Sequence, residues 1–129
     1  MNLNKFTEKA QESVITAQNL ATELTHSEIT PEHLLVALVE QDSGIVPSIL
    51  RKMALDPAHV AAEARKLLDS LPKQYGGDVR FSPRMNLIFE SAQAEAKRLQ
   101  DEFVSTEHLL MGLLSEPGRA GGSAVDWTR

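Results

Sequence analysis

Two stretches that lie 75 positions apart decide the fold: Ile29-Thr30-Pro31-Glu32-His33-Leu34-Leu35 and Val104-Ser105-Thr106-Glu107-His108-Leu109-Leu110. In each stretch a Thr or Ser precedes the shared Glu-His-Leu-Leu. Such a hydroxyl residue is a preferred N-cap of a short helix, and the leucines supply the buried face of that helix. When the sequence is aligned with itself at this offset, residues 6–40 match residues 81–115 without a gap, and ten of the 35 pairs are identical. The chain therefore contains an internal duplication.

A long amphipathic helix is expected at the start of each copy. Apolar residues recur there at alternating steps of four and three, which places their side chains on one face of a helix. They are Ala10, Val14, Ala17, Ala21 and Leu24 in the first copy, and Met85, Phe89, Ala92, Ala96 and Leu99 in the second. Thr7 is the expected N-cap of the first long helix, and Ser82 followed by Pro83 begins the second.

Two further helices are predicted in the first copy, over residues 45–54 and 57–70. The next ten residues contain Pro72 and a Gly-Gly pair, a composition typical of a linker. After Glu116 no apolar period continues, so the second copy is expected to be incomplete.

These patterns predict an all-α fold made of two pseudo-twofold helical repeats in one domain over residues 1–116. The first repeat covers residues 1–70, the linker residues 71–80, and the second repeat residues 81–116. A tail follows over residues 117–129, whose order the sequence does not predict. Aromatic residues are only 5% of the chain, which favours packed helices over a β-sandwich.

The charge and composition of the chain exclude several classes of partner. Thirteen basic and 18 acidic side chains give a net charge of −5, so no overall positive field attracts nucleic acid. No apolar run reaches the ~18 residues of a membrane span, so no membrane partner is expected. The chain has no cysteine, and its N-terminus lacks the pattern of a secretion signal. Both features favour a cytoplasmic protein.

No motif for catalysis or for binding a metal ion is found. The phosphate-binding loop of ATPases and the Gly-x-Ser-x-Gly motif of hydrolases are both absent from the sequence, so an enzyme is not expected. The four histidines lack the spacing of a metal site, so no metal is expected either. His33 and His108 are instead expected to lie between helices, hydrogen-bonded to the backbone or to a neighbouring carboxylate.

Glu32 and Glu107 occupy equivalent first-turn positions, for which two roles stay open. A carboxylate at this position compensates the positive end of the helix dipole. It can also receive a guanidinium group through a bidentate pair of hydrogen bonds. Other acidic residues are expected to form a solvated face, namely Glu8, Glu12, Glu90, Glu95, Asp101 and Glu102.

Four segments resemble the Clp N-terminal repeat domain, which begins the Clp family of AAA+ unfoldases. They are Lys5-Phe6-Thr7-Glu8-Lys9-Ala10-Gln11, Leu71-Pro72-Lys73, and the two stretches quoted above. The Leu-Pro-Lys linker, together with Pro47 after Gly44-Ile45-Val46, is most similar to the ClpB disaggregase branch of the family.

The resemblance implies an all-α domain of two four-helix repeats, tethered to ATPase rings that form a hexamer. It implies no catalysis and no cofactor on this chain, since ATP is bound by AAA+ modules that the sequence does not contain. Such domains engage unfolded or aggregated polypeptides and, in some members, adaptor proteins, through an apolar groove and polar positions near the helix starts. Members that recognise phosphoarginine use a threonine and a glutamate, which match Thr7 with Glu32 and Ser82 with Glu107 here.

The resulting hypothesis is a polypeptide-binding module. Leu110 is expected to contribute to the apolar groove, and Asp101 and Glu107 to form an acidic rim that favours basic segments. The alternative is a stand-alone helical module that dimerises, or that regulates the full-length chaperone by competing with it.

Overall fold

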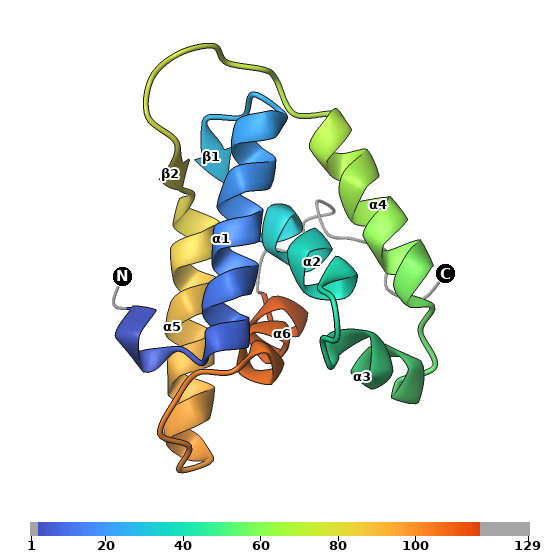
Figure 1. Ribbon diagram of the computed structural model, residues 1–129, viewed down its shortest axis with the longest axis vertical. Coiled ribbons are helices and arrows are strands. Elements are labelled where there is room, and N and C mark those ends of the chain that lie inside the picture. The colour runs from blue at the N-terminus through green and yellow to red at the C-terminus, as the bar shows by residue number, and fades with distance from the viewer. Residues whose placement is uncertain (1–2, 117–129) are drawn as a thin grey trace.

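Helices make up most of residues 3–116, the part of the chain that the computed structural model describes (Figure 1). After a short 3-10 turn, η1 (Leu3–Lys5), the elements are α1 (Glu8–Glu23), β1 (Glu28–Ile29), α2 (Pro31–Glu40), α3 (Val46–Lys52), α4 (Pro57–Asp69), β2 (Arg80–Phe81), α5 (Pro83–Arg98) and α6 (Thr106–Leu114). The all-α fold class is thus confirmed, and each predicted helix is present. The predicted tail over residues 117–129 lies outside the described residues.

Short parallel backbone pairs join the two copies and obey the 75-residue offset. Ile29 in β1 pairs with Phe81 in β2, and Phe6 forms an isolated parallel bridge with Val104. Adding 75 to Phe6 and Ile29 gives Phe81 and Val104, so each copy supplies the same two positions to the other. This exchange confirms the pseudo-twofold relation. Arg80 and Phe81, at the predicted junction of the linker and the second repeat, form β2.

The two long helices, α1 and α5, end in the same way. Thr25 and Gln100 adopt left-handed backbone conformations with φ of 62° and 60°. The next residue then donates its backbone N–H back into the helix, from His26 to the Ala21 carbonyl at 2.9 Å and from Asp101 to the Ala96 carbonyl at 2.8 Å. This arrangement is a Schellman motif, which satisfies the free carbonyls of the last turn. It fixes His26 and Asp101 at equivalent places in the two copies.

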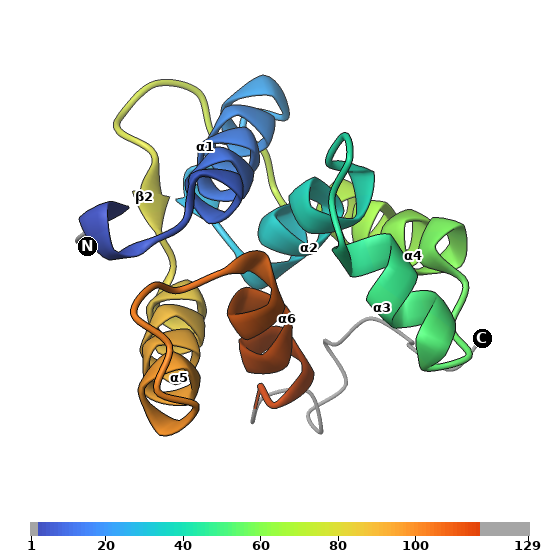
Figure 2. The ribbon, with the colours of Figure 1, turned by 60° about the horizontal axis from the view of Figure 1, so that its bottom comes forward.

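The core lies between the long helices α1 and α5 and the central helices α2 and α6. In α2, residues 31–39 are all buried, because α1, α4 and α6 pack around this helix. Figure 2 shows α5, α6, α2 and α4 following one another across the molecule. Phe6 and Phe81, which are equivalent under the duplication, both pack edge-on against Phe89, with ring centroids 6.0 and 5.2 Å away. Edge-to-face contacts of this kind stabilise a core beyond simple burial.

One apolar residue of the predicted period is more exposed than that period predicts. Leu99 is 47% exposed, because it lies at the C-cap of α5, where the helical period no longer turns the side chain inward. None of the helices in residues 3–116 is both long and apolar enough to cross a membrane.

Candidate functional site

The hydroxyl groups of Thr7 and Ser82 cap the two long helices, as the sequence predicts. Thr7 Oγ1 accepts a hydrogen bond from the Ala10 backbone at 3.1 Å, and Ser82 Oγ accepts one from the Met85 backbone at 3.0 Å. Thr7 is partly exposed, whereas Ser82 is buried. The two caps are therefore equivalent in the backbone but differ in their access to a ligand.

The start of α1 lies beside the start of α6, where the two helices border a cavity of about 340 Å³. We call this the α1–α6 cavity; Thr7, Lys9, Gln41, Ile45 and Glu107 are among its lining residues. Ile45 is 46% exposed, which gives the cavity an apolar contact surface. Glu107 is exposed in the first turn of α6, and its carboxylate gives the cavity a negative charge.

The cavity corrects the pairing of site residues that the resemblance implied. Thr7 lies with Glu107 and not with Glu32, because the Phe6–Val104 bridge brings the start of α1 to the second copy. By the same exchange, Glu32 lies with the start of α5. Each polar position is therefore assembled from both halves of the duplication.

At the equivalent position, the start of α5, Arg84 of the chain itself forms ion pairs with the carboxylates of Glu32 and Glu116. Arg84 Nη1 and Nη2 donate to the two carboxylate oxygens of Glu32 at 3.2 and 2.8 Å, and Arg84 Nε and Nη2 donate to Glu116 at 2.5 and 3.0 Å. We call these three residues the Arg84 triad. Both glutamates are 8% exposed. Glu32 thus pairs in a bidentate manner with a guanidinium of the chain itself, and it also lies in the first turn of α2, where its charge suits the helix dipole.

The Arg84 triad is held together by charge. The hydrogen bonds that Arg84 donates to Glu116, and secondarily those to Glu32, raise the pKa of Arg84 against the opposing effect of burial, so the guanidinium stays charged. Charge-assisted bidentate bonds of this type are stronger and more directional than bonds between neutral groups. The position on α5 is therefore closed, while the α1–α6 cavity is open.

His33 and His108 lie between helices, as predicted. The N-cap backbone N–H of Thr30 donates to His33 Nδ1 at 2.8 Å, and that of Ser105 donates to His108 Nδ1 at 2.9 Å. Since Nδ1 accepts in both rings, we assign the proton of the neutral imidazole to Nε2.

The partners of the two Nε2 atoms differ between the copies. His33 Nε2 lies 2.9 Å from His26 Nδ1, whereas His108 Nε2 lies 2.8 Å from the carboxylate of Asp101. Burial, followed by the nearby charge of His26, lowers the pKa of His33 to about 4. Burial also lowers the pKa of His26. Asp101, half of whose side chain is exposed, positions His108 in addition to any contact that it makes with a ligand.

The Leu110 side chain belongs to the core and not to the surface. It is 2% exposed, so it offers almost no area to a substrate in this conformation. Its predicted contact with substrate stays a prediction, and Leu110→Ala would first test the packing of α6. Ile45 supplies the exposed apolar surface that was expected of Leu110.

No group of three or more His, Cys, Asp or Glu side chains within residues 3–116 is arranged to hold a metal ion. The helix starts are capped, the α1–α6 cavity has an apolar and an acidic side chain in its lining, and the equivalent position on α5 is closed by Arg84.

Two helical copies joined by crossed backbone pairs define a domain of the Clp N-terminal type. Residues 5–124 match the model of the family described as the Clp repeat (R) N-terminal domain, and the chain belongs to this family. In sequence it is ClpB-like. It is 39% identical over 122 residues to the chaperone protein ClpB of Nitratidesulfovibrio vulgaris, a match that covers 91% of this chain and 14% of the relative. The chain thus spans about one seventh of the length of that relative.

Solved structures share the fold. The N-terminal domain of Hsp104 from Candida albicans superposes with a TM-score of 0.78 at 22% identity, covering 95% of this chain and 85% of that one. A ClpV N-domain, solved in complex with a VipB peptide, superposes with a TM-score of 0.77 at 19% identity, covering 91% of this chain and 72% of that one. At these identities the likeness concerns the fold alone.

Proposed function

We propose that this chain is the polypeptide-binding N-terminal module of a ClpB-like AAA+ disaggregase. It binds exposed segments of unfolded or aggregated proteins, or adaptor proteins, and does not alter them chemically. ATP is bound by AAA+ modules of the hexameric parent protein and not by this domain. Membership of the Clp N-domain family and similarity to the first part of a ClpB chaperone support the proposal. The absence of cysteine from the sequence is consistent with a role in the cytoplasm.

The observation that carries the proposal is the α1–α6 cavity. It presents an exposed Ile45 beside the exposed carboxylate of Glu107, while the equivalent position on α5 is filled by Arg84. An apolar side chain with a carboxylate beside it suits segments that combine apolar and basic residues. The solved complex of a ClpV N-domain with a peptide is a precedent within this fold.

Binding in the cavity is expected to be weak. A cavity of about 340 Å³ receives only a few side chains and buries far less than the ~1,200 Å² of a stable protein interface. The expected dissociation constant is therefore in the micromolar range or above. Weak binding suits a module that passes its substrate onward.

A titration with fluorescein-labelled casein, an unfolded model polypeptide, tests the proposal. The double variant Ile45→Ala/Glu107→Gln is expected to bind about ten-fold more weakly, because it removes the apolar contact and the charge of the cavity. The matched control is Ile15→Ala/Glu102→Gln, since Ile15 is 49% exposed on α1 and does not line the cavity. Equal affinity of both double variants would contradict the site.

Two further measurements separate the proposal from its alternatives. A stable dimer in sedimentation at low micromolar concentration would favour a stand-alone module that dimerises or competes with the full-length chaperone. ATP hydrolysis by the purified chain would contradict a binding module without catalysis. A monomer that binds casein and leaves ATP intact is the expected result.

A further inference from the structure

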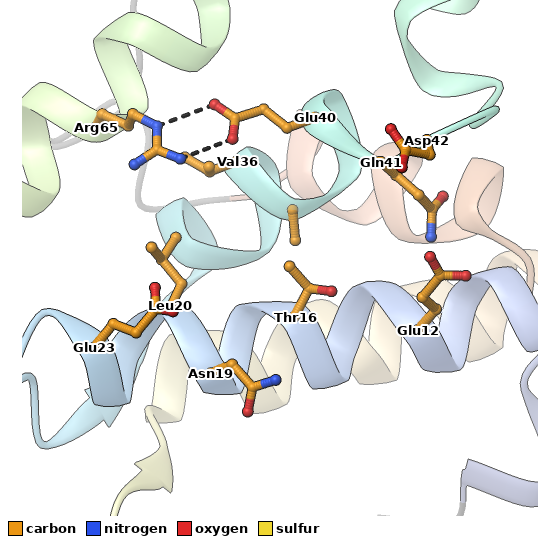
Figure 3. Close-up of a pocket in the computed structure, with 11 residues that line it drawn as sticks. Glu12, Thr16, Asn19, Leu20, Glu23, Val36, Glu40, Gln41, Asp42 and Arg65 are labelled. Carbon is orange, nitrogen blue, oxygen red and sulfur yellow. Dashed lines mark hydrogen bonds and ion pairs between the residues drawn. The ribbon is translucent and has the colours of Figure 1, made fainter.

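A second hollow runs along α1 beyond its first turn and is separate from the α1–α6 cavity except for Gln41 (Figure 3). We call it the α1–α2 groove. It has a volume of about 410 Å³ and lies between α1 and α2, with Arg65 of α4 at one end. Its lining includes the buried apolar side chains of Val36 and Ala37 and the exposed side chain of Thr16.

The rim of the α1–α2 groove is strongly acidic. Its lining contains four carboxylates and a single cationic side chain, Arg65: the carboxylates are Glu12, Glu23, Glu40 and Asp42. Arg65 donates through Nε and Nη2 to the two oxygens of Glu40 at 3.0 and 2.7 Å. Lys9 approaches Glu12 from outside the groove at 3.9 Å. Negative charge therefore remains in excess along the groove.

Arg65 shows that a guanidinium group can bind to the carboxylates at the rim of the groove. Its guanidinium lies against Glu40 at one end, where Glu23 approaches from α1 (Figure 3). The hydrogen bond with Glu40 is the main cause that raises the pKa of Arg65, and the nearby charges of Asp69 and Glu23 add to it. One guanidinium supplied by the chain itself is thus already bound at the rim, and the carboxylates at the other end, Glu12 and Asp42, face the same groove.

The acidic rim is not a requirement of the fold. The aligned positions in the second copy that correspond to Glu12, Glu23 and Glu40 are Leu87, Arg98 and Ser115. None of these is acidic, although they belong to the equivalent helix pair or its C-cap. The equivalent helix pair therefore folds without carboxylates at these positions.

We propose that the α1–α2 groove binds an extended basic segment of another polypeptide, with cationic side chains about five residues apart. Glu12 and Glu23 lie 11 positions apart on α1, which corresponds to ~16 Å along the helix axis. An extended chain covers that distance in about five residues. Arginine or lysine at the two ends of such a segment meets carboxylates at both ends of the groove, and small residues between them contact Thr16 and Ala37.

An extended segment suits the groove better than a helix. A helix is ~10 Å wide with its side chains. An extended chain is thinner and can lie on the floor between α1 and α2. Its contacts are mainly pairs of exposed charges, so binding should weaken steeply as salt screens them.

This inference adds a second surface to the proposed function and does not depend on the α1–α6 cavity. The probe is a labelled peptide of about twelve residues with two arginines five positions apart in a background of alanine and serine. A second peptide carries glutamine in place of both arginines. Fluorescence polarisation at about 50 mM and about 500 mM salt measures the affinity of each.

The test variant is Glu12→Gln/Glu23→Gln, which removes two carboxylates from the rim and is expected to weaken binding of the arginine peptide about five-fold at low salt. The matched control is Glu90→Gln/Glu102→Gln, which removes the same charge from exposed positions outside the groove and should leave binding unchanged. The glutamine peptide should not bind. Circular dichroism confirms that both variants are folded.

Three results would overturn the inference: no binding of the arginine peptide to the wild-type chain, an equal loss in both double variants, or equal affinity for the two peptides. An equal loss would show that the peptide responds only to the net charge of the domain. If Ile45→Ala/Glu107→Gln loses affinity for the arginine peptide while Glu12→Gln/Glu23→Gln keeps it, the peptide binds in the α1–α6 cavity and not in the groove. Casein binding tests the proposed function separately, so the two failures are distinguishable.

Discussion

Arg84→Ala is expected to lower the free energy of unfolding by about 2–3 kcal/mol, measured by urea denaturation at pH 7. The substitution leaves Glu32 and Glu116, each 8% exposed, without the guanidinium that lies between them. Breaking a fully buried ion pair by removing one partner costs ~3–5 kcal/mol, because the remaining charge stays desolvated. The Arg84 side chain is 36% exposed, so we expect a smaller loss than in that limit.

Arg65→Ala provides a matched control. Arg65 also forms two hydrogen bonds with one glutamate, at 3.0 and 2.7 Å, but its side chain and that of Glu40 are 47% and 44% exposed. Exposed pairs of this kind contribute about 0.2–1 kcal/mol, so the control should unfold close to the wild-type urea concentration. Arg84→Lys should recover only part of the stability, since an ammonium group cannot reproduce the planar pattern of donors. Equal losses for Arg84→Ala and Arg65→Ala would show that the burial of the triad has no energetic consequence.

The helices and the duplication were predictable because their signals are local. N-cap hydroxyls, Pro at the first helical position and apolar residues at steps of three and four each act within one helix. The crossed pairs Ile29–Phe81 and Phe6–Val104 were not predicted, since two-residue strands have no period of their own. Their register depends on how the two copies approach each other.

The candidate site shows the same division. The caps Thr7 and Ser82 follow from the sequence, but their partners across the duplication do not, because the crossed pairs decide which helix starts meet. The position of Arg84 in the sequence does indicate a partner. It is the second residue of α5, and a cation near a helix N-terminus is unfavourable unless carboxylates compensate it.

Ile45 and Leu110 show why apolar contacts were harder to assign. Leu110 follows the helical period of α6, and that period predicts burial, which the structure confirms at 2% exposure. Ile45 lies immediately before α3 and after Gly44, where no period indicates which way a side chain points. Its exposure depends on the packing of the neighbouring segments, and only the structure shows it.

Acid is expected to destabilise the domain through the first copy. His33 is fully buried, and burial together with the nearby His26 lowers its pKa from 6.5 to about 4. Between these two pH values the unfolded chain binds a proton at His33 and the folded chain does not. The contribution of neutral His33 to the free energy of unfolding is therefore complete above about pH 6.5 and is lost as the pH falls toward 4. We expect this group to account for about 2–3 kcal/mol of that loss.

The geometry explains why the folded state resists protonation. His33 Nδ1 already accepts the Thr30 backbone N–H, so a proton on that nitrogen would break the capping interaction. His33 Nε2 donates to His26 Nδ1. Positive charge on both the His33 and the His26 rings would therefore be mutually repulsive. Lys73 adds positive charge near His26, while Asp69 opposes it. In the second copy the partner of the equivalent ring is a carboxylate, because His108 Nε2 donates to Asp101.

His26→Asp gives the first copy the partner that the second copy already has. We expect urea denaturation followed by circular dichroism to show that this variant loses less than half as much stability as the wild type between pH 6.5 and 4, because a carboxylate stabilises protonated His33. The reciprocal Asp101→His should make the acid-induced loss larger than in the wild type. Stability curves that stay parallel for the wild type and both variants would show that the histidine partners do not control the response to acid.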